Sequence, residues 1–147
     1  MRVVSLHLGR GPGLPKAAVE ELHLVAGMGA EGDRHFGRNP DQAVLVAGTQ
    51  AYARAAEAGI ALPWGALGEN LLLEPDPHAL GPGARLGIGS ALLELTSVCT
   101  VCDALSRFDL RLPRLLYGRR GLYARVLQGG LVRVGDEVRI LHPPQPW

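Results

Sequence analysis

Residues 84–98 read "ARLGIGSALLELTSV", and this stretch indicates the fold class more directly than any other part of the chain. Residues 84–88 and 91–98 form two short apolar runs, and the second alternates with polar residues as a half-buried strand does. Gly89 and Ser90 separate the runs, and a two-residue connection with glycine is typical of a β-hairpin. The stretch therefore predicts two adjacent antiparallel strands.

Similar short runs continue on both sides of this hairpin. We expect further strands at residues 2–8, 19–25, 42–46, 70–74, 122–128 and 137–141. The chain contains 20 glycines and 11 prolines, which suits a fold of many strands joined by many turns. Strands without regularly alternating helices disfavour a doubly wound parallel sheet and favour a compact barrel or sandwich.

Two segments interrupt the strand pattern. Residues 49–59, "TQAYARAAEAG", have Thr49 as a helix cap, an alanine-rich body and Gly59 as a stop, so they predict a helix. In residues 103–121, Asp103 can cap a short helix and Pro113 can open another. With these helices the sequence predicts a mainly β fold with a few short peripheral helices.

Length and composition limit the classes of function. A chain of 147 residues has the size of one ordinary domain, so we expect a single domain over residues 1–147. The formal net charge of +1 gives no general attraction to nucleic acid or to an anionic membrane. No apolar stretch approaches the ~18–20 residues that span a bilayer, and the N-terminus does not resemble a signal peptide. We therefore expect a cytoplasmic protein with no nucleic-acid or membrane partner.

Two glycine-containing loops carry polar residues that could bind a ligand. Residues 29–37, "GAEGDRHFG", present Asp33, Arg34 and His35 between glycines, which let the backbone approach a ligand while Arg and His donate hydrogen bonds. Residues 65–74, "GALGENLLLE", place Glu69 and Asn70 where a loop enters a very apolar strand. A charged surface turn and a polar strand start are the simpler interpretations.

The two cysteines of the chain, Cys99 and Cys102, lie three positions apart after the strand at residues 91–98. Structural zinc takes four Cys or His ligands, and no histidine lies nearby in the sequence, which disfavours a zinc site. A C-x-x-C pair also suggests thiol–disulfide exchange, but the usual βαβ context is missing. A thiol near a helix N-terminus or an arginine has increased thiolate character, which nucleophilic, redox and soft-metal chemistry all require. A buried apolar pair is the simplest alternative.

An arginine-rich stretch follows the cysteines, with Asp109 as its acidic residue. Its members are Arg107, Arg111, Arg114, Arg119, Arg120 and Arg125. Arginines can hold a phosphate-bearing ligand by bidentate contacts, whereas a solvated helix face is the alternative for most of them.

Taken in order, these motifs resemble the MOSC domain, which occurs at the C-terminus of molybdenum-cofactor sulfurases, in the mitochondrial amidoxime-reducing component and as small bacterial proteins. The matching stretches are "GLPKAAVEELHL", "GAEGDRH", "DQAVLV", "GALGENLLLE", "GPGARLGIGSALLELTSVCTVC" and "GLYARVLQGGLVRVGDEV". The resemblance implies a distorted β-barrel that binds the pterin form of the molybdenum cofactor or hands sulfur to it.

The resemblance also implies roles for particular residues. Cys102 matches the family's cysteine, which is the thiolate ligand of molybdenum or the carrier of a persulfide. The positions suited to the pterin and its phosphate are Lys16, Arg34, His35, Asn70 and Arg125. Cys99 occupies a position that only some relatives fill with cysteine, and Val101 replaces the proline that familiar relatives have before the working cysteine. That substitution frees the backbone ahead of Cys102.

Three functions follow from this comparison. The first is a molybdenum-cofactor-binding oxidoreductase component that acts on N-hydroxylated compounds and receives electrons from an iron–sulfur or flavin partner, because the chain lacks the cysteines of a cluster and a dinucleotide motif. The second is a sulfur carrier with a persulfide on Cys102, served by a separate cysteine desulfurase that holds pyridoxal phosphate. The third is a non-catalytic binding domain.

Overall fold

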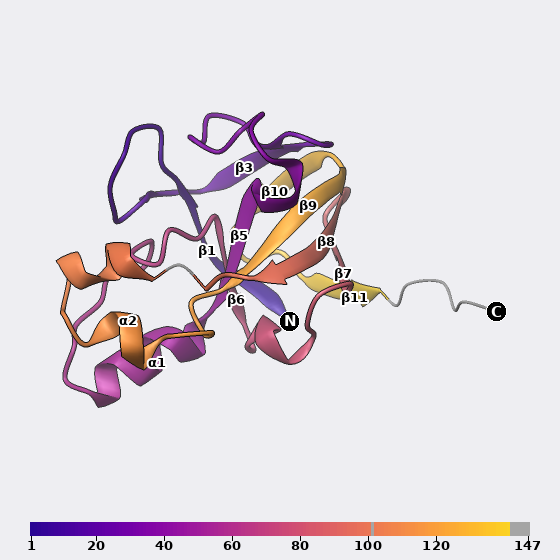
Figure 1. Ribbon diagram of the computed structural model, residues 1–147. Coiled ribbons are helices and arrows are strands. Elements are labelled where there is room, and N and C mark those ends of the chain that lie inside the picture. Colours follow the sequence, from indigo (N-terminus) through magenta and orange to yellow (C-terminus); the bar gives the residue numbers. More distant parts are fainter. Residues whose placement is uncertain (101, 142–147) are drawn as a thin grey trace.

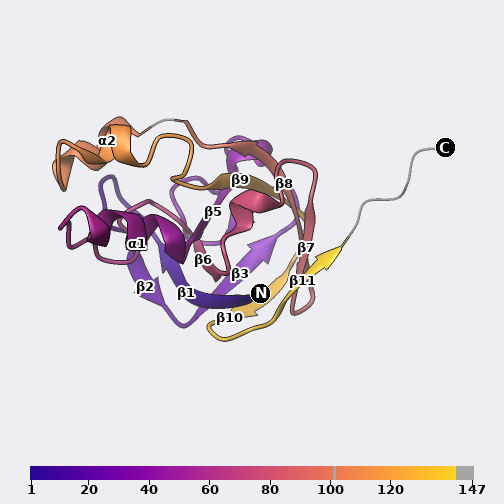
Figure 2. The same ribbon diagram turned by 90° about the horizontal axis from the view of Figure 1, so that it is seen from below.

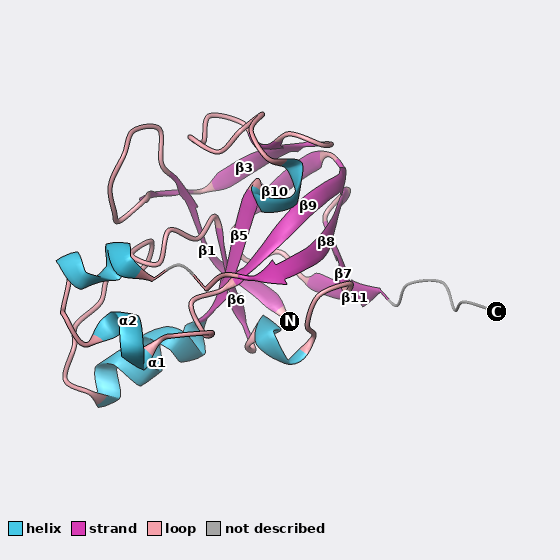
Figure 3. Ribbon diagram, viewed as in Figure 1, coloured by secondary structure: helices cyan, strands magenta, loops and turns pink. Residues whose placement is uncertain are grey.

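The fold is described from a computed structural model, which places residues 1–100 and 102–141. The strands are β1 (Arg2–Leu8), β2 (Ala17–Val19), β3 (Glu21–Val25), β4 (Gly29–Ala30), β5 (Val44–Gly48), β6 (Leu71–Glu74), β7 (Arg85–Ile88), β8 (Ala91–Val98), β9 (Leu122–Gln128), β10 (Gly130–Arg133) and β11 (Val138–Leu141). The helices are α1 (Thr49–Glu57) and α2 (Leu112–Leu115), with short 3₁₀ helices at Pro40–Gln42, Pro77–Ala79 and Asp103–Arg107. The mainly β class is confirmed (Figure 3).

The strands form one large and one small sheet. The large sheet has the order β11-β7-β8-β9-β5-β6-β1-β2, and the small one has the order β10-β3-β4. Figure 2 shows the strands curling around the interior. The large sheet is not closed into the barrel that the family resemblance implies, although β1 and the segment before β11 meet at an isolated bridge between Arg2 and Glu137. The strands therefore enclose the core without a continuous hydrogen-bonded ring.

The hairpin predicted from residues 84–98 is confirmed. β7 and β8 are antiparallel, with Ile88 opposite Ala91 and Leu86 opposite Leu93. Gly89 has a φ of +57°, the left-handed conformation that a two-residue hairpin turn needs. Alternation then places Leu86, Ile88 and Leu93 in the buried interior.

A second apolar cluster lies outside the sheet, where the helices pack on one another (Figure 1). Helix α1 contributes Ala51 and Ala55, which are spaced one turn apart and are buried. They share this cluster with Leu105, Leu112 and Cys102 from the segment after β8. The cluster therefore fixes the chain immediately after the cysteine pair.

The sequence missed some pairings. The run at residues 19–25 is split at Glu20 into β2, which pairs with β1, and β3, which pairs with β10 and β4. β4 and β10 were not expected, because segments this short become strands through their pairing with β3 rather than through a pattern of their own. Among the described residues, no helix is long and apolar enough to cross a membrane.

Candidate functional site

A buried carboxylate, Asp33, organises the polar residues at one end of the sheet. Its Oδ1 accepts hydrogen bonds from the backbone N–H of Gly9 (3.0 Å) and from Asn70 Nδ2 (3.2 Å), and Lys16 Nζ lies 3.1 Å from Oδ1 and 3.2 Å from Oδ2. Burial by itself raises the pKa of Asp33, but the hydrogen bonds from His35 and Gly9 and the charge of Lys16 outweigh it and hold that pKa well below its usual value. Asp33 is therefore a buried anion.

Lys16 and Asn70, both predicted as binding residues, belong to this buried network. Burial lowers the pKa of Lys16, and the neighbouring Asp33 carboxylate opposes that change. Asn70 Oδ1 accepts from the Leu45 N–H at 3.2 Å, and its Nδ2 also donates to the His7 carbonyl at 3.1 Å. The Asn70 amide thus ties β5, β1 and the Asp33 loop together at the start of β6.

A cavity of about 250 Å³ opens beside this network. It is lined by Arg34, His35, Gln42, Leu45, Gly68, Cys99, Ala104, Arg120 and Tyr123. The structure therefore brings Arg34 and His35, predicted from the 29–37 loop, to the same wall as a thiol and a further arginine. Arg120 Nε donates to the Leu67 carbonyl at 2.7 Å, which fixes this guanidinium at the cavity.

The two cysteines have different surroundings, although both are buried and neither is in a disulfide. Cys99 lines the cavity, and its Sγ lies 3.4 Å from the hydroxyl oxygen of Tyr123. Cys102 packs in the helical cluster; burial raises the pKa of its thiol, and the positive charge of Arg120 works in the opposite direction. The departure at Val101 lies outside the described residues.

The arginine-rich stretch does not form one basic patch. Arg125 Nη2 lies 2.6 Å from Asp41 Oδ1, and its Nη1 lies 3.9 Å from Glu94. Tyr123 and Arg125 lie two positions apart on the same face of β9, but only Tyr123 lines the cavity. The structure therefore does not bring Arg125 into this site. Arg111 pairs with Asp109 at 2.9 Å on the surface.

Arg34 also borders a second hollow, of about 340 Å³, on the other side of its side chain. This hollow is formed by the loop of residues 8–15 together with Ala17, Arg34 and Arg107. Arg34 Nη1 donates to the carbonyls of Gly11 and Gly13 at 2.7 and 3.0 Å, which holds the loop in place. The two hollows thus meet at one arginine.

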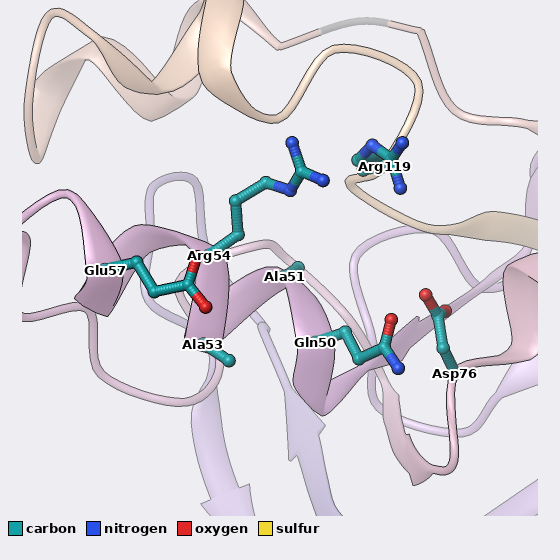
Figure 4. A pocket seen from close by; sticks show the side chains of 7 residues that line it. All are labelled: Gln50, Ala51, Ala53, Arg54, Glu57, Asp76 and Arg119. Carbon is teal, nitrogen blue, oxygen red and sulfur yellow. The ribbon is translucent and has the colours of Figure 1, made fainter.

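A third cavity, of about 180 Å³, lies over helix α1 and contains none of the predicted site residues. Figure 4 shows the guanidinium groups of Arg54 and Arg119 extending toward the same space, with Glu57 and Asp76 also at its edge. The cavity over α1 has two basic and two acidic residues and no thiol. The cavity beside Asp33 is therefore the better candidate site.

A buried acid that sequence reasoning treated as an exposed strand start is Glu69. Its Oε2 accepts a 2.6 Å hydrogen bond from Tyr52, and burial raises its pKa to about 7. Burial likewise lowers the pKa of the neighbouring His7 to about 4, so His7 is neutral at pH 7. The tyrosine in the predicted helix was the available signal, since a buried hydroxyl needs a polar partner.

Comparison with known proteins defines the family. The family model of the MOSC domain matches residues 31–139, which include the loop of Arg34 and His35, both cysteines and β9. The chain belongs to the MOSC domain family. None of the curated proteins matches the sequence.

Solved structures resemble this MOSC chain over nearly its whole length. The YuaD protein from Bacillus subtilis has a TM-score of 0.80 at 20% identity, and the match covers 93% of each chain. YiiM from Geobacillus stearothermophilus has a TM-score of 0.77 at 21% identity, with 96% of this chain and 75% of YiiM covered. YiiM from Escherichia coli has a TM-score of 0.74 at 23% identity, with 99% and 72% covered. At these identities the likeness establishes a shared fold.

Proposed function

We propose that this MOSC chain binds the molybdenum cofactor in the cavity beside Asp33 and acts as an oxidoreductase component on N-hydroxylated compounds. The observation that supports this most strongly is the composition of the cavity wall. It combines the cationic side chains of Arg34 and Arg120 and the imidazole of His35 with the thiol of Cys99, three residues before Cys102. Cationic donors suit an anionic phosphate-bearing pterin, and a thiolate is the soft ligand that a dithiolene-bound metal accepts.

The shape of the site agrees with a ligand of that kind. Gly68 has a φ of +81°, and a Cβ there would come within 3.2 Å of Arg120 Nη2, so glycine keeps this wall open. The cavity of about 250 Å³ is smaller than typical cofactor pockets of ~300–1,000 Å³. We therefore place the rest of the cofactor across Arg34 in the adjoining hollow, where Arg107 can receive the phosphate.

Each residue then has a role that its surroundings support. Arg34 and Arg120 bind the anionic parts of the ligand, and the Asp33 network with Lys16 and Asn70 holds this wall in place. By the family resemblance Cys102 would be the thiolate ligand of molybdenum. Burial raises the pKa of its thiol and the charge of Arg120 opposes that change, so the bound metal itself would have to favour the thiolate. When bound, the molybdenum centre supplies two-electron redox chemistry, and its electrons come from a separate iron–sulfur or flavin protein.

The structure favours cofactor binding over the sulfur-carrier alternative. A persulfide carrier exchanges sulfur with a separate cysteine desulfurase that bears pyridoxal phosphate, which requires an exposed thiol. The Cys102 residue is 4% exposed and lies among apolar side chains. That burial disfavours direct exchange between the Cys102 thiol and the active site of another protein.

The test is the cofactor content of protein made in a bacterial host that synthesises the cofactor. Molybdenum and pterin are measured per chain in the wild type, in Cys102→Ser and in Cys99→Ser. We expect about one of each in the wild type, loss of molybdenum in Cys102→Ser and its retention in Cys99→Ser. Wild-type protein that contains neither molybdenum nor pterin, although the other molybdoenzymes of the same cells are loaded, would contradict the proposal. If that cofactor-free protein also carried cyanide-labile sulfur, the sulfur-carrier function would be supported instead. Loss in Cys99→Ser alone would move the ligand to Cys99.

A further inference from the structure

We propose that His35 is the proton donor of the site, and that Asp33 is the positioning residue that orients its imidazole. This inference rests on the proposed function, because the proton goes to a bound N-hydroxylated substrate. It adds a catalytic role to a residue that the family resemblance implies only as a contact for the pterin. The geometry of the imidazole carries it.

The two ring nitrogens of His35 have different surroundings. Nδ1 lies 3.2 Å from Asp33 Oδ2, and the backbone N–H of His35 donates to the same oxygen at 3.2 Å. The Asp33 side chain is fully buried, whereas that of His35 is 47% exposed and lines the cavity. A carboxylate that holds Nδ1–H leaves Nε2 as the nitrogen available to a ligand.

Lys16 helps to decide which nitrogen carries the proton. Its Nζ lies 3.5 Å from Nδ1 of His35, but an ammonium group can only donate. Lys16 also contacts both oxygens of Asp33, whose lowered pKa keeps the carboxylate charged. The shorter contact with an anion favours Nδ1–H, so the protonated ring presents Nε2–H toward the cavity.

The other charged and titratable groups near His35 come from three further parts of the chain. They are Arg34 beside it, Arg120 from the segment before β9, and Cys99 and Tyr123 on the facing wall. The ring therefore lies among two guanidinium groups, the Asp33 carboxylate, a thiol and a phenol hydroxyl.

The reaction assigned to His35 is one step in a balanced reduction. An N-hydroxylated compound, two electrons and two protons give the corresponding N–H compound and water. The bound metal cofactor, in its reduced form, would supply the two electrons for cleavage of the N–O bond. The proton on Nε2 of His35 would go to the leaving oxygen, which would depart as water. The second proton comes from solvent and goes to nitrogen, and solvent then reprotonates His35.

The first experiment needs no cofactor. Imidazole ¹⁵N NMR spectra are recorded on wild-type protein and on His35→Asn, which identifies the His35 signals by their loss, with His23→Asn on β3 as a matched control. Neutral His35 is expected to carry its proton on Nδ1, and Asp33→Asn, if it folds, is expected to shift it toward Nε2. A wild-type ring protonated on Nε2 would overturn the role of Asp33 without reference to any cofactor.

The second experiment measures steady-state kinetics on cofactor-loaded protein with an artificial reductant and an N-hydroxylated substrate. His35→Asn is expected to keep its molybdenum content and KM, to lose about 100-fold in kcat, and to differ from the wild type in the pH dependence of kcat. Equal kcat and an unchanged pH profile in the loaded variant would overturn the inference. Absence of molybdenum and of activity in the wild type itself would instead contradict the proposed function, and with it the catalytic role of His35.

Discussion

The buried acidic residues in and near the site differ in their protonation. Asp33 is charged and has several donors. Glu69, next to Asn70 in the sequence, has one oxygen bonded to Tyr52 and the other, Oε1, without a hydrogen-bond partner among the described residues. Burial favours the protonated form of such a carboxyl group, which explains its pKa of about 7. The stability of the protein should therefore depend on pH through Glu69.

The sign of that dependence can be worked out. The pKa of Glu69 is about 7 in the folded chain against 4.5 for a free side chain, so the folded state binds more protons between these values and stability falls as pH rises. His7, with a pKa of about 4 against 6.5, acts in the opposite direction between pH 4 and 6.5. The two effects oppose each other up to pH 6.5, and the destabilisation by ionised Glu69 is complete above pH 7.

Glu69→Gln removes this ionisation and keeps an oxygen to accept from Tyr52. We expect the variant to be more stable than the wild type at pH 8, by on the order of 2 kcal/mol, with the difference shrinking toward pH 5. Urea unfolding at pH 5, 6.5 and 8 measures it. Parallel stability profiles for the two proteins would show that Glu69 does not ionise in this range.

Sequence reasoning found the loop of Arg34 and His35 and the cysteine pair, because these motifs concentrate polar residues in short stretches. It could not separate Lys16 and Asn70, which serve the buried network, from Arg34, which borders the cavity. That distinction depends on which side chains point inward after distant segments meet. For the same reason it gave Tyr123 no role, although Tyr123 reaches the cavity from an alternating strand.

At the scale of elements, alternation located strands well. β1, β8 and β9 have the bounds expected from the sequence. β8 and β9 alternate over most of their length, whereas β1 was recognisable as an apolar run, with consecutive buried residues in its second half. Pro113 opens α2 within its first turn, and the helix predicted at 49–59 runs as α1 with Gly48 rather than Thr49 as its cap. Strand β4 escaped prediction because two residues are too short to show a pattern, and β10 because its partner β3 is far away in the sequence.

The loop that connects α1 to β6 offers a test of how closely the elements must approach. Gly65 has a φ of +92°, and a Cβ there would collide with the Lys16 carbonyl oxygen; Gly59 has a φ of +78° with open space around it. Gly59→Ala should therefore reveal the conformational cost alone, about 1 kcal/mol, and Gly65→Ala should lose at least about twice that. Urea unfolding of both variants measures this difference, and equal losses would mean that the backbones separate freely there.

At the scale of the whole molecule, the strands and helices divide the work of forming the site. The strands enclose one apolar core, and the helices build a second around Cys102, with the cavity between the chain segments that connect them. The β class follows from strand patterns and turn residues, but the closure of a sheet depends on how its two ends meet. Here the two ends meet only at the isolated bridge between Arg2 and Glu137, without a continuous ladder of hydrogen bonds. No local sequence pattern predicts whether such a closure forms.

The central claim, that this arrangement holds a molybdenum cofactor, is tested most directly by locating the metal. Crystals of protein purified from a cofactor-producing host can be measured on both sides of the molybdenum absorption edge. We expect one anomalous difference peak in the cavity lined by Arg34, His35 and Arg120, within bonding distance of the Cys102 sulfur. A peak elsewhere on the chain, or none in crystals of protein from cells that load their other molybdoenzymes, would contradict it.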